Sequence, residues 1–166
     1  EMKSTGEVMG IDFDLRPAMA KALLAGNLML PPKGSILLTI ADKDKQEASQ
    51  WIKQLHQIGY SFYATIGTSA LLKKLGIPVT QVNKLGEPSP NVHTIVTEGI
   101  VDGVVNTIAN AAESLRDGFE IRRSAVERRI PCYTSIDTAR VVVETLLYGG
   151  MDYHILPNAT YVDGQP

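Results

Sequence analysis

The sequence contains a single cysteine and almost no excess charge, and each shortage excludes a class of function. Cys132 alone can form neither an internal disulfide nor a cysteine-based metal cluster. Its place in the apolar run from Ile130 to Tyr133 predicts a small buried thiol rather than a reactive one. The formal net charge is -2, and basic residues are scattered among acidic ones. The chain therefore lacks the basic patch that binds nucleic acid or anionic lipid.

Long apolar runs are also missing. No stretch approaches the roughly 20 apolar residues of a membrane span, and residues 1–7 lack the apolar core of a signal peptide. We therefore expect a cytoplasmic protein with no membrane partner. The 166 residues are enough for one compact domain with its own core.

Short apolar segments alternate with segments of helical character along most of the chain. The predicted strands are residues 35–40, 61–64, 78–82, 101–106 and 131–133. The predicted helices are residues 17–25, 44–58, 68–75, 92–98, 118–129 and 137–148. Five short strands alternating with helices predict an α/β fold with a five-stranded parallel sheet covered on both faces.

Three regions follow from this pattern. Residues 1–16 have little periodicity and are expected to be a linker or a remnant of a preceding domain. Residues 17–150 form the predicted α/β domain, and residues 151–166 form an irregular, peripheral tail with two prolines. Asp44 and Glu47 have the spacing of a capping box at the start of the second helix.

Ligands of open parallel sheets bind beyond the carboxyl ends of the strands. The polar residues that follow the predicted strands are Lys45, Thr65, Gly67, Thr68, Lys84, Asn106 and Thr107. A helix that starts after a glycine offers unpaired N–H groups to an anion, and lysines and hydroxyls add charge and donors. The asparagine can bond to a sugar or a base. This edge is therefore predicted to bind an anion.

Each of these residues also has a simpler interpretation. Thr68 could be an ordinary N-cap, Lys45 a solvated lysine in a first helical turn, and Lys84 a charge on a surface loop. Their convergence at one edge of one sheet favours the anion site.

Signals for catalysis are weak. The histidines His56, His93 and His154 have neither an adjacent nucleophile nor metal-ligand spacing. Asp42 and Asp44 are the carboxylates nearest the anion site, and Arg122 and Arg123 are typical of salt bridges or interfaces. We therefore expect binding rather than turnover, with no catalytic residue, metal or cofactor in this chain.

The segment Lys3–Gly10 resembles the end of the second ATP-grasp half of the large subunit of carbamoyl phosphate synthetase. The chain from there to about Gly150 resembles the methylglyoxal-synthase-like domain that closes this subunit. The supporting motifs are Asp44-Lys45, Ala64–Thr68, Val82–Lys84, Val105–Thr107, Ile121–Ala125 and Tyr133–Ser135.

This resemblance implies a Rossmann-like sheet and an allosteric role, with UMP, IMP or phosphoribosyl pyrophosphate as the effector. It assigns phosphate contacts to Lys45, Thr65, Gly67, Thr68 and Lys84, and sugar or base contacts to Asn106 and Thr107. It places Thr134 at the contact with the neighbouring synthetase domain, on the ornithine side in ornithine-activated relatives.

The parent protein implied by the resemblance is an ATP-dependent carbon–nitrogen ligase that uses Mg²⁺ or Mn²⁺. It makes carbamoyl phosphate from bicarbonate and glutamine or ammonia, for pyrimidine and arginine synthesis. Its implied partners are the synthetase domains of the same subunit and the glutaminase small subunit.

Two features set limits on the resemblance. Ile108 stands where relatives carry a second threonine, and the next residues lack the arginines of some relatives, which weakens the purine contact. Lys84 stands where animal relatives activated by N-acetylglutamate have an aromatic residue, which favours a phosphorylated ligand. Two alternatives remain, a methylglyoxal-synthase-like lyase with Glu87 as its candidate base, and a purely structural or interaction domain.

Overall fold

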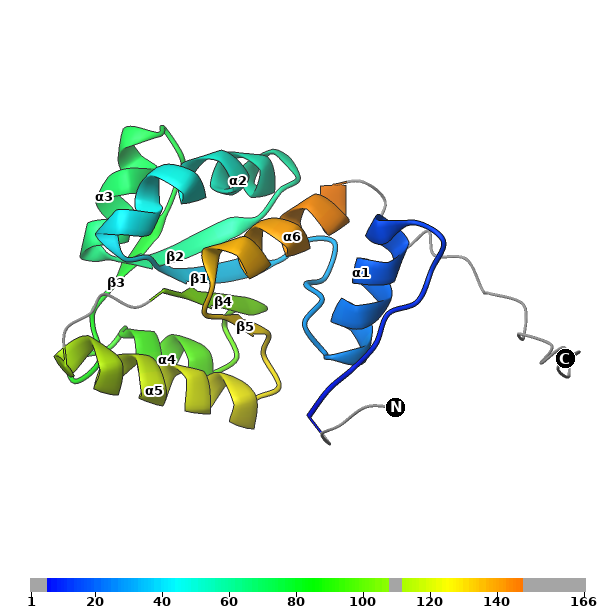
Figure 1. Cartoon of the computed structure of the whole chain (residues 1–166). Coiled ribbons are helices and arrows are strands. Elements are labelled where there is room, and N and C mark those ends of the chain that lie inside the picture. Colours follow the sequence, from blue (N-terminus) through cyan, green and yellow to red (C-terminus); the bar gives the residue numbers. More distant parts are fainter. Residues whose placement is uncertain (1–5, 108–111, 148–166) are drawn as a thin grey trace, which may run out of the picture.

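The computed structural model describes residues 6–107 and 112–147, and of residues 112–117 only the backbone (Figure 1). The strands are β1 (Ser35–Thr39), β2 (Ser61–Thr65), β3 (Thr80–Val82), β4 (Gly103–Asn106) and β5 (Cys132–Tyr133). The helices are α1 (Leu15–Ala25), α2 (Lys45–Gln57), α3 (Ile66–Lys74), α4 (Val92–Thr97), α5 (Ala112–Glu127) and α6 (Ile136–Leu147), with a 3₁₀ turn, η1, over Asp42–Asp44. The tail from residue 151 onward and Ile108 lie outside the described residues.

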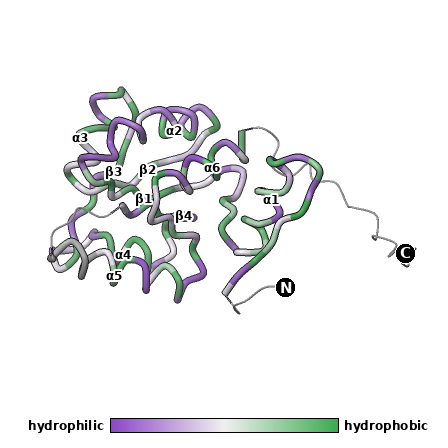
Figure 2. Tube along the Cα trace, viewed as in Figure 1, coloured by the Kyte–Doolittle hydropathy of each residue, from purple (hydrophilic) through white to green (hydrophobic). Residues whose placement is uncertain are grey.

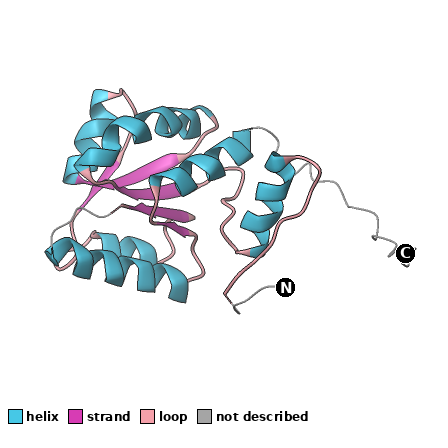
Figure 3. Ribbon diagram, in the orientation of Figure 1, coloured by secondary structure: helices cyan, strands magenta, loops and turns pink. Residues whose placement is uncertain are grey.

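The five strands form one sheet in the order β3-β2-β1-β4-β5, and every neighbouring pair is parallel. Helices α2, α3 and α6 cover one face, and α4 and α5 cover the other (Figures 1 and 3). The predicted fold class, a five-stranded parallel sheet between two helical layers, is therefore confirmed.

The sheet separates two hydrophobic clusters because neighbouring residues of a strand point to opposite faces. Ile36 and Leu38 of β1 pack into the cluster that includes Trp51 of α2, whereas Leu37 packs into the cluster that includes Ile121 of α5. All three β1 residues are at most 1% exposed, so β1 is buried on both sides, as expected of a central parallel strand.

Helix α2 presents the apolar face that its sequence predicts, because Ala48, Trp51, Ile52 and Leu55 are all buried. Figure 2 shows hydrophilic and hydrophobic residues interleaved along the helices, as amphipathic packing on a sheet requires. The predicted capping box is wrong: the Asp44 side chain makes no capping hydrogen bond. The turn η1 already leads the backbone into α2, and the Glu47 carboxylate pairs with Arg140 instead.

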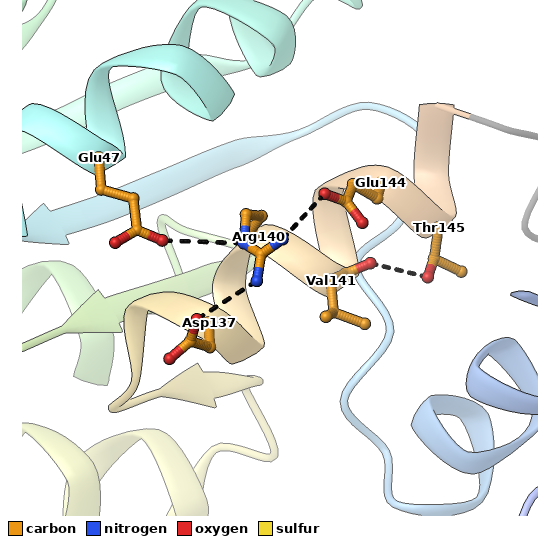
Figure 4. Close-up of polar contacts among 6 residues, drawn as sticks. All are labelled: Glu47, Asp137, Arg140, Val141, Glu144 and Thr145. Atoms are coloured by element: carbon orange, nitrogen blue, oxygen red, sulfur yellow. Dashed lines mark hydrogen bonds and ion pairs between the residues drawn. The ribbon is translucent and has the colours of Figure 1, made fainter. Parts of the chain in front are cut away.

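Arg140 of α6 connects α6 to α2 (Figure 4). Its guanidinium lies 3.3 Å from Asp137 Oδ1, 3.5 Å from Glu144 Oε1 and 3.7 Å from Glu47 Oε1. A groove of about 560 Å³ lies beside this cluster, between α1, α2 and α6. The four side chains are about half exposed or more, so their ion pairs add little to stability.

The segment before α1 folds back along that helix. The Lys21 ammonium lies 2.8 Å from Asp12 Oδ2 and donates to the Ile11 carbonyl at 2.8 Å. Gly10 approaches the backbone of α1 so closely that an added Cβ would lie 1.9 Å from the Ala18 carbonyl oxygen. Helix α1 begins at Leu15, two residues before the predicted start, and lies beside α6 on the side away from the carboxyl ends of the strands (Figure 1). That this segment derives from a preceding domain stays a prediction.

No helix among the described residues is long and apolar enough to cross a membrane.

Candidate functional site

The carboxyl edge of the sheet contains a cavity of about 180 Å³, which we call the Lys84 cavity. Its polar wall residues are Thr39, Thr65, Lys84, Asn106 and Thr107, which come from the ends of four strands and the residues that follow them. Its floor and far side are completed by Ile40, Ala41, Leu85, Val92, Gly118 and Ile121. The cavity lies between β1 and β4. At this point the strand order switches: β2 and β3 are added on one side of β1, and β4 and β5 on the other. Ligand sites of open parallel sheets are expected at such a switch point.

Four of the predicted effector-site residues line this cavity: Thr65, Lys84, Asn106 and Thr107. Three others, Lys45, Gly67 and Thr68, do not line it but lie at the starts of α2 and α3. An added Cβ on Gly67 would lie 3.3 Å from Lys45 Nζ, so the missing side chain lets the lysine approach the start of α3. The eighth residue, Thr134, lines a neighbouring cavity that is described below.

The Lys45 ammonium forms an ion pair with Asp42 at 2.5 Å. The hydrogen bond from Lys45 and its positive charge lower the pKa of the Asp42 carboxyl. The Lys45 side chain is 22% exposed, so it is more enclosed than a lysine that is simply solvated in a first helical turn. Because Asp42 itself is fully exposed and already paired, it is poorly placed to act as a catalytic base.

Hydrogen bonds orient the hydroxyl groups of the wall. Asn106 Nδ2 donates to Thr39 Oγ1 at 2.7 Å, and the Ala41 backbone N–H donates to Thr107 Oγ1 at 2.9 Å. Among the described residues neither hydroxyl has a protein acceptor for its own hydrogen. Each hydroxyl therefore accepts one hydrogen bond from the protein and still has its own O–H to donate to a ligand. Sequence patterns missed Thr39 because it is the last residue of a buried strand.

Asn106 provides the complementary group. The residue is 5% exposed, and its Oδ1 is buried with no hydrogen-bond partner among the described residues. A buried acceptor without a partner is unfavourable by about 1–3 kcal/mol. A ligand hydroxyl or N–H group would satisfy it. The wall therefore combines a cation, several hydroxyl donors and one acceptor.

Thr68 lies inside the first turn of α3 rather than at its N-cap. Helix α3 begins at Ile66 with Thr65 as its N-cap residue, so the interpretation of Thr68 as an N-cap is wrong. The chain passes from β2 into α3 without an intervening loop. Thr68 is 1% exposed, and its Oγ1 accepts the Ile40 backbone N–H at 3.0 Å. This bond holds the end of β1 against α3.

Glu87, the candidate base of the lyase alternative, is engaged in its own loop. Its Oε2 accepts the Lys84 backbone N–H at 2.8 Å, and the residue is not part of the wall of the Lys84 cavity. No carboxylate is present among the described residues that line the Lys84 cavity. Elsewhere in the described ranges, no group of three or more His, Cys, Asp or Glu residues could hold a metal ion. His56 and His93 are exposed and line none of the cavities described here, and His154 lies outside the described residues.

A second cavity, of about 560 Å³, adjoins the first at the same edge, and we call it the Arg122 cavity. It is lined by Lys43, Asp44, Thr107, Arg122, Thr134, Ser135, Ile136 and Asp137. Thr107 belongs to the walls of both cavities. The two consecutive arginines of α5 therefore differ: Arg122 faces this cavity, whereas Arg123 forms the predicted salt bridge, with Glu127 at 2.9 Å.

Cys132 is partly buried rather than fully buried, so the prediction of a buried thiol is confirmed only in part. Burial raises the pKa of this thiol to about 11, and the positive charge of Arg122 acts in the opposite direction. A thiol with a raised pKa has little thiolate at neutral pH and is a poor nucleophile.

The family model of the MGS-like domain matches residues 47–134, more than half of the chain. The chain belongs to the MGS-like domain family. The matched range runs from the first turn of α2 to the residue after β5, so it contains all but the first strand of the sheet and most of the wall of the Lys84 cavity. Of the Arg122 cavity it contains Thr107, Arg122 and Thr134. Membership in this family is compatible with an allosteric domain and with a methylglyoxal-synthase-like lyase.

Proposed function

We propose that this MGS-like domain is the effector-binding regulatory domain of a carbamoyl phosphate synthetase large subunit and binds a phosphorylated effector in the Lys84 cavity. The resemblance of Lys3–Gly10 to the end of an ATP-grasp domain supports the choice of parent. The parent would be a cytoplasmic enzyme that uses ATP with Mg²⁺ or Mn²⁺ and works with a glutaminase subunit. The effector would be UMP, IMP or phosphoribosyl pyrophosphate.

One observation carries the choice of binding over catalysis. The described wall of the Lys84 cavity contains a lysine and three threonine hydroxyls but no carboxylate. A phosphate is stabilised by such donors, whereas the elimination of phosphate from a triose needs a placed base. The nearby Glu87 carboxylate is bonded to the Lys84 backbone. The acceptor on Asn106 suits the hydroxyl groups of a sugar.

Regulation would follow from linkage. An effector that binds one orientation of this domain more tightly shifts the whole synthetase toward that orientation. Thr39 ends β1 and Thr65 ends β2, and both line the Lys84 cavity, so an effector bound there would contact the ends of both strands.

Calorimetry with UMP, IMP and phosphoribosyl pyrophosphate tests the proposal. We expect at least one of them to bind, and the matching unphosphorylated nucleoside to bind far more weakly. Lys84→Ala should weaken that binding about 10- to 100-fold, because a hydrogen bond to a charged group is worth about 1.5–3 kcal/mol. Lys53→Ala is the matched control, since Lys53 is exposed on α2 and lines neither cavity.

Two results would overturn the proposal. Failure of all three ligands to bind would leave a structural or interaction domain. A robust release of methylglyoxal from dihydroxyacetone phosphate by the purified chain would establish the lyase alternative instead. If Lys84→Ala and Lys53→Ala bind equally well, Lys84 is only a surface charge.

A further inference from the structure

The Lys84 cavity is small for the ligands considered above. Its volume is about 180 Å³, whereas pockets for drug-sized ligands measure about 300–1,000 Å³. A ligand larger than a simple phosphate must extend beyond this cavity. The Arg122 cavity, of about 560 Å³, adjoins it at Thr107 and provides that space.

Arg122 is the unusual group of the second cavity. It is half-buried, and no described carboxylate lies within 4 Å of its guanidinium. Its neighbour Arg123 is 62% exposed and is neutralised by Glu127. A cation held partly out of water without a counter-ion is unfavourable, so an anionic ligand group beside Arg122 would be favoured.

Other groups of the wall add to the positive potential. Lys43 lines the cavity, and Thr134 and Ser135 add hydroxyl groups that form no side-chain hydrogen bond with described residues. The first N–H groups of α6, a helix of 12 residues, have no acceptor within the helix. Two carboxylates also line the cavity, but Asp137 is paired with Arg140 at 3.3 Å. Arg140 also pairs with Glu47 and Glu144, so Asp44 and Asp137 both oppose the two cations of the lining. Arg122, which has no described carboxylate within 4 Å, is therefore the favoured place for an anionic group.

We propose that the effector carries two separate anionic groups and spans both cavities across Thr107. One group binds at Lys84 and the threonine hydroxyls, and the other binds at Arg122, Lys43 and the start of α6. The ligand class is a sugar with phosphate groups at two positions. Phosphoribosyl pyrophosphate belongs to this class, whereas UMP and IMP carry a single phosphate. This inference rests on the proposed function, because it extends the same site.

Calorimetry on the full chain with Arg122→Gln tests this arrangement. The probes are phosphoribosyl pyrophosphate, with two phosphate positions, and ribose 5-phosphate and UMP, with one. We expect Arg122→Gln to weaken phosphoribosyl pyrophosphate binding about 10- to 100-fold and to leave the two monophosphates within about twofold. Arg123→Gln, on the next residue of α5, should change none of the three. Arg122→Lys should keep part of the affinity because it keeps the charge.

Several results would overturn the inference. Equal binding of phosphoribosyl pyrophosphate by the wild type and Arg122→Gln would do so, and so would an equal loss for all three probes. Matching circular dichroism and unfolding midpoints of the variants would show that the fold is intact. If Lys84→Ala weakens binding but Arg122→Gln does not, the bipartite site is wrong and the effector domain stands. If no phosphorylated probe binds the wild type, both proposals are wrong.

Discussion

Replacing Thr68 with valine would remove one hydroxyl from the interior while keeping the size and branching of the side chain. Thr68 is 1% exposed, and its Oγ1 accepts the backbone N–H of Ile40 at 3.0 Å. The valine would leave that buried N–H without its acceptor. A buried donor that loses its partner costs about 1–3 kcal/mol. We therefore expect the free energy of unfolding of Thr68→Val to fall by about that amount.

The effect can be measured by urea unfolding followed through tryptophan fluorescence. Trp51 is the single tryptophan of the chain and is 2% exposed in the main core, so its emission reports on loss of that core. In thermal unfolding, 1 kcal/mol corresponds to about 2–4 °C for a chain of this size. The expected decrease in melting temperature is therefore about 2–12 °C.

Thr65 provides the matched control. Thr65 is the N-cap residue of α3, but its hydroxyl makes no capping hydrogen bond and no other hydrogen bond with described residues. It lines the Lys84 cavity. Thr65→Val should leave stability within about 0.5 kcal/mol of the wild type and weaken effector binding. Thr68→Ser keeps the acceptor and loses one methyl group, at about 0.8 kcal/mol. A Thr68→Val variant as stable as the wild type would refute the role of this bond, and so would an equal loss in Thr65→Val.

Two further predictions concern other parts of the molecule. Burial raises the pKa of Cys132 to about 11 and that of Tyr60 to about 12, above their ordinary values of 9.0 and 10.0. The stability linked to these groups is present below about pH 9 and is lost as pH rises through 11 to 12. The urea midpoint should therefore fall as pH rises from about 9 to 12, and it should fall less in Cys132→Ala. A midpoint independent of pH would contradict this. Gly10→Ala would place a Cβ 1.9 Å from the Ala18 carbonyl oxygen and 2.6 Å from the Ala22 nitrogen. We expect faster protease cleavage of residues 6–14, whereas Gly6→Ala, whose Cβ meets no atom within 4 Å, should be cleaved at the wild-type rate.

Several features of the fold could be predicted from the sequence alone. The apolar run in β1 and the spaced apolar residues of α2 indicated a buried strand and an amphipathic helix, and both are confirmed. Alternation of such segments implied a parallel sheet, and a parallel sheet has its ligand edge at the carboxyl ends. These features depend on periodicity within a few residues, which the sequence displays directly.

Only the tertiary structure decided which side chains at that edge bond to the protein itself and which face a cavity. Thr39 and Asn106 are 67 positions apart in the sequence, yet they share a hydrogen bond because β1 and β4 are neighbours in the sheet. Thr68 turns its oxygen to Ile40, and Arg122 faces a cavity while Arg123 faces its own helix. Such roles depend on distances between strands and helices that are far apart along the chain. Residue type and local spacing predict which groups reach the edge, and packing determines which of them remain available to a ligand.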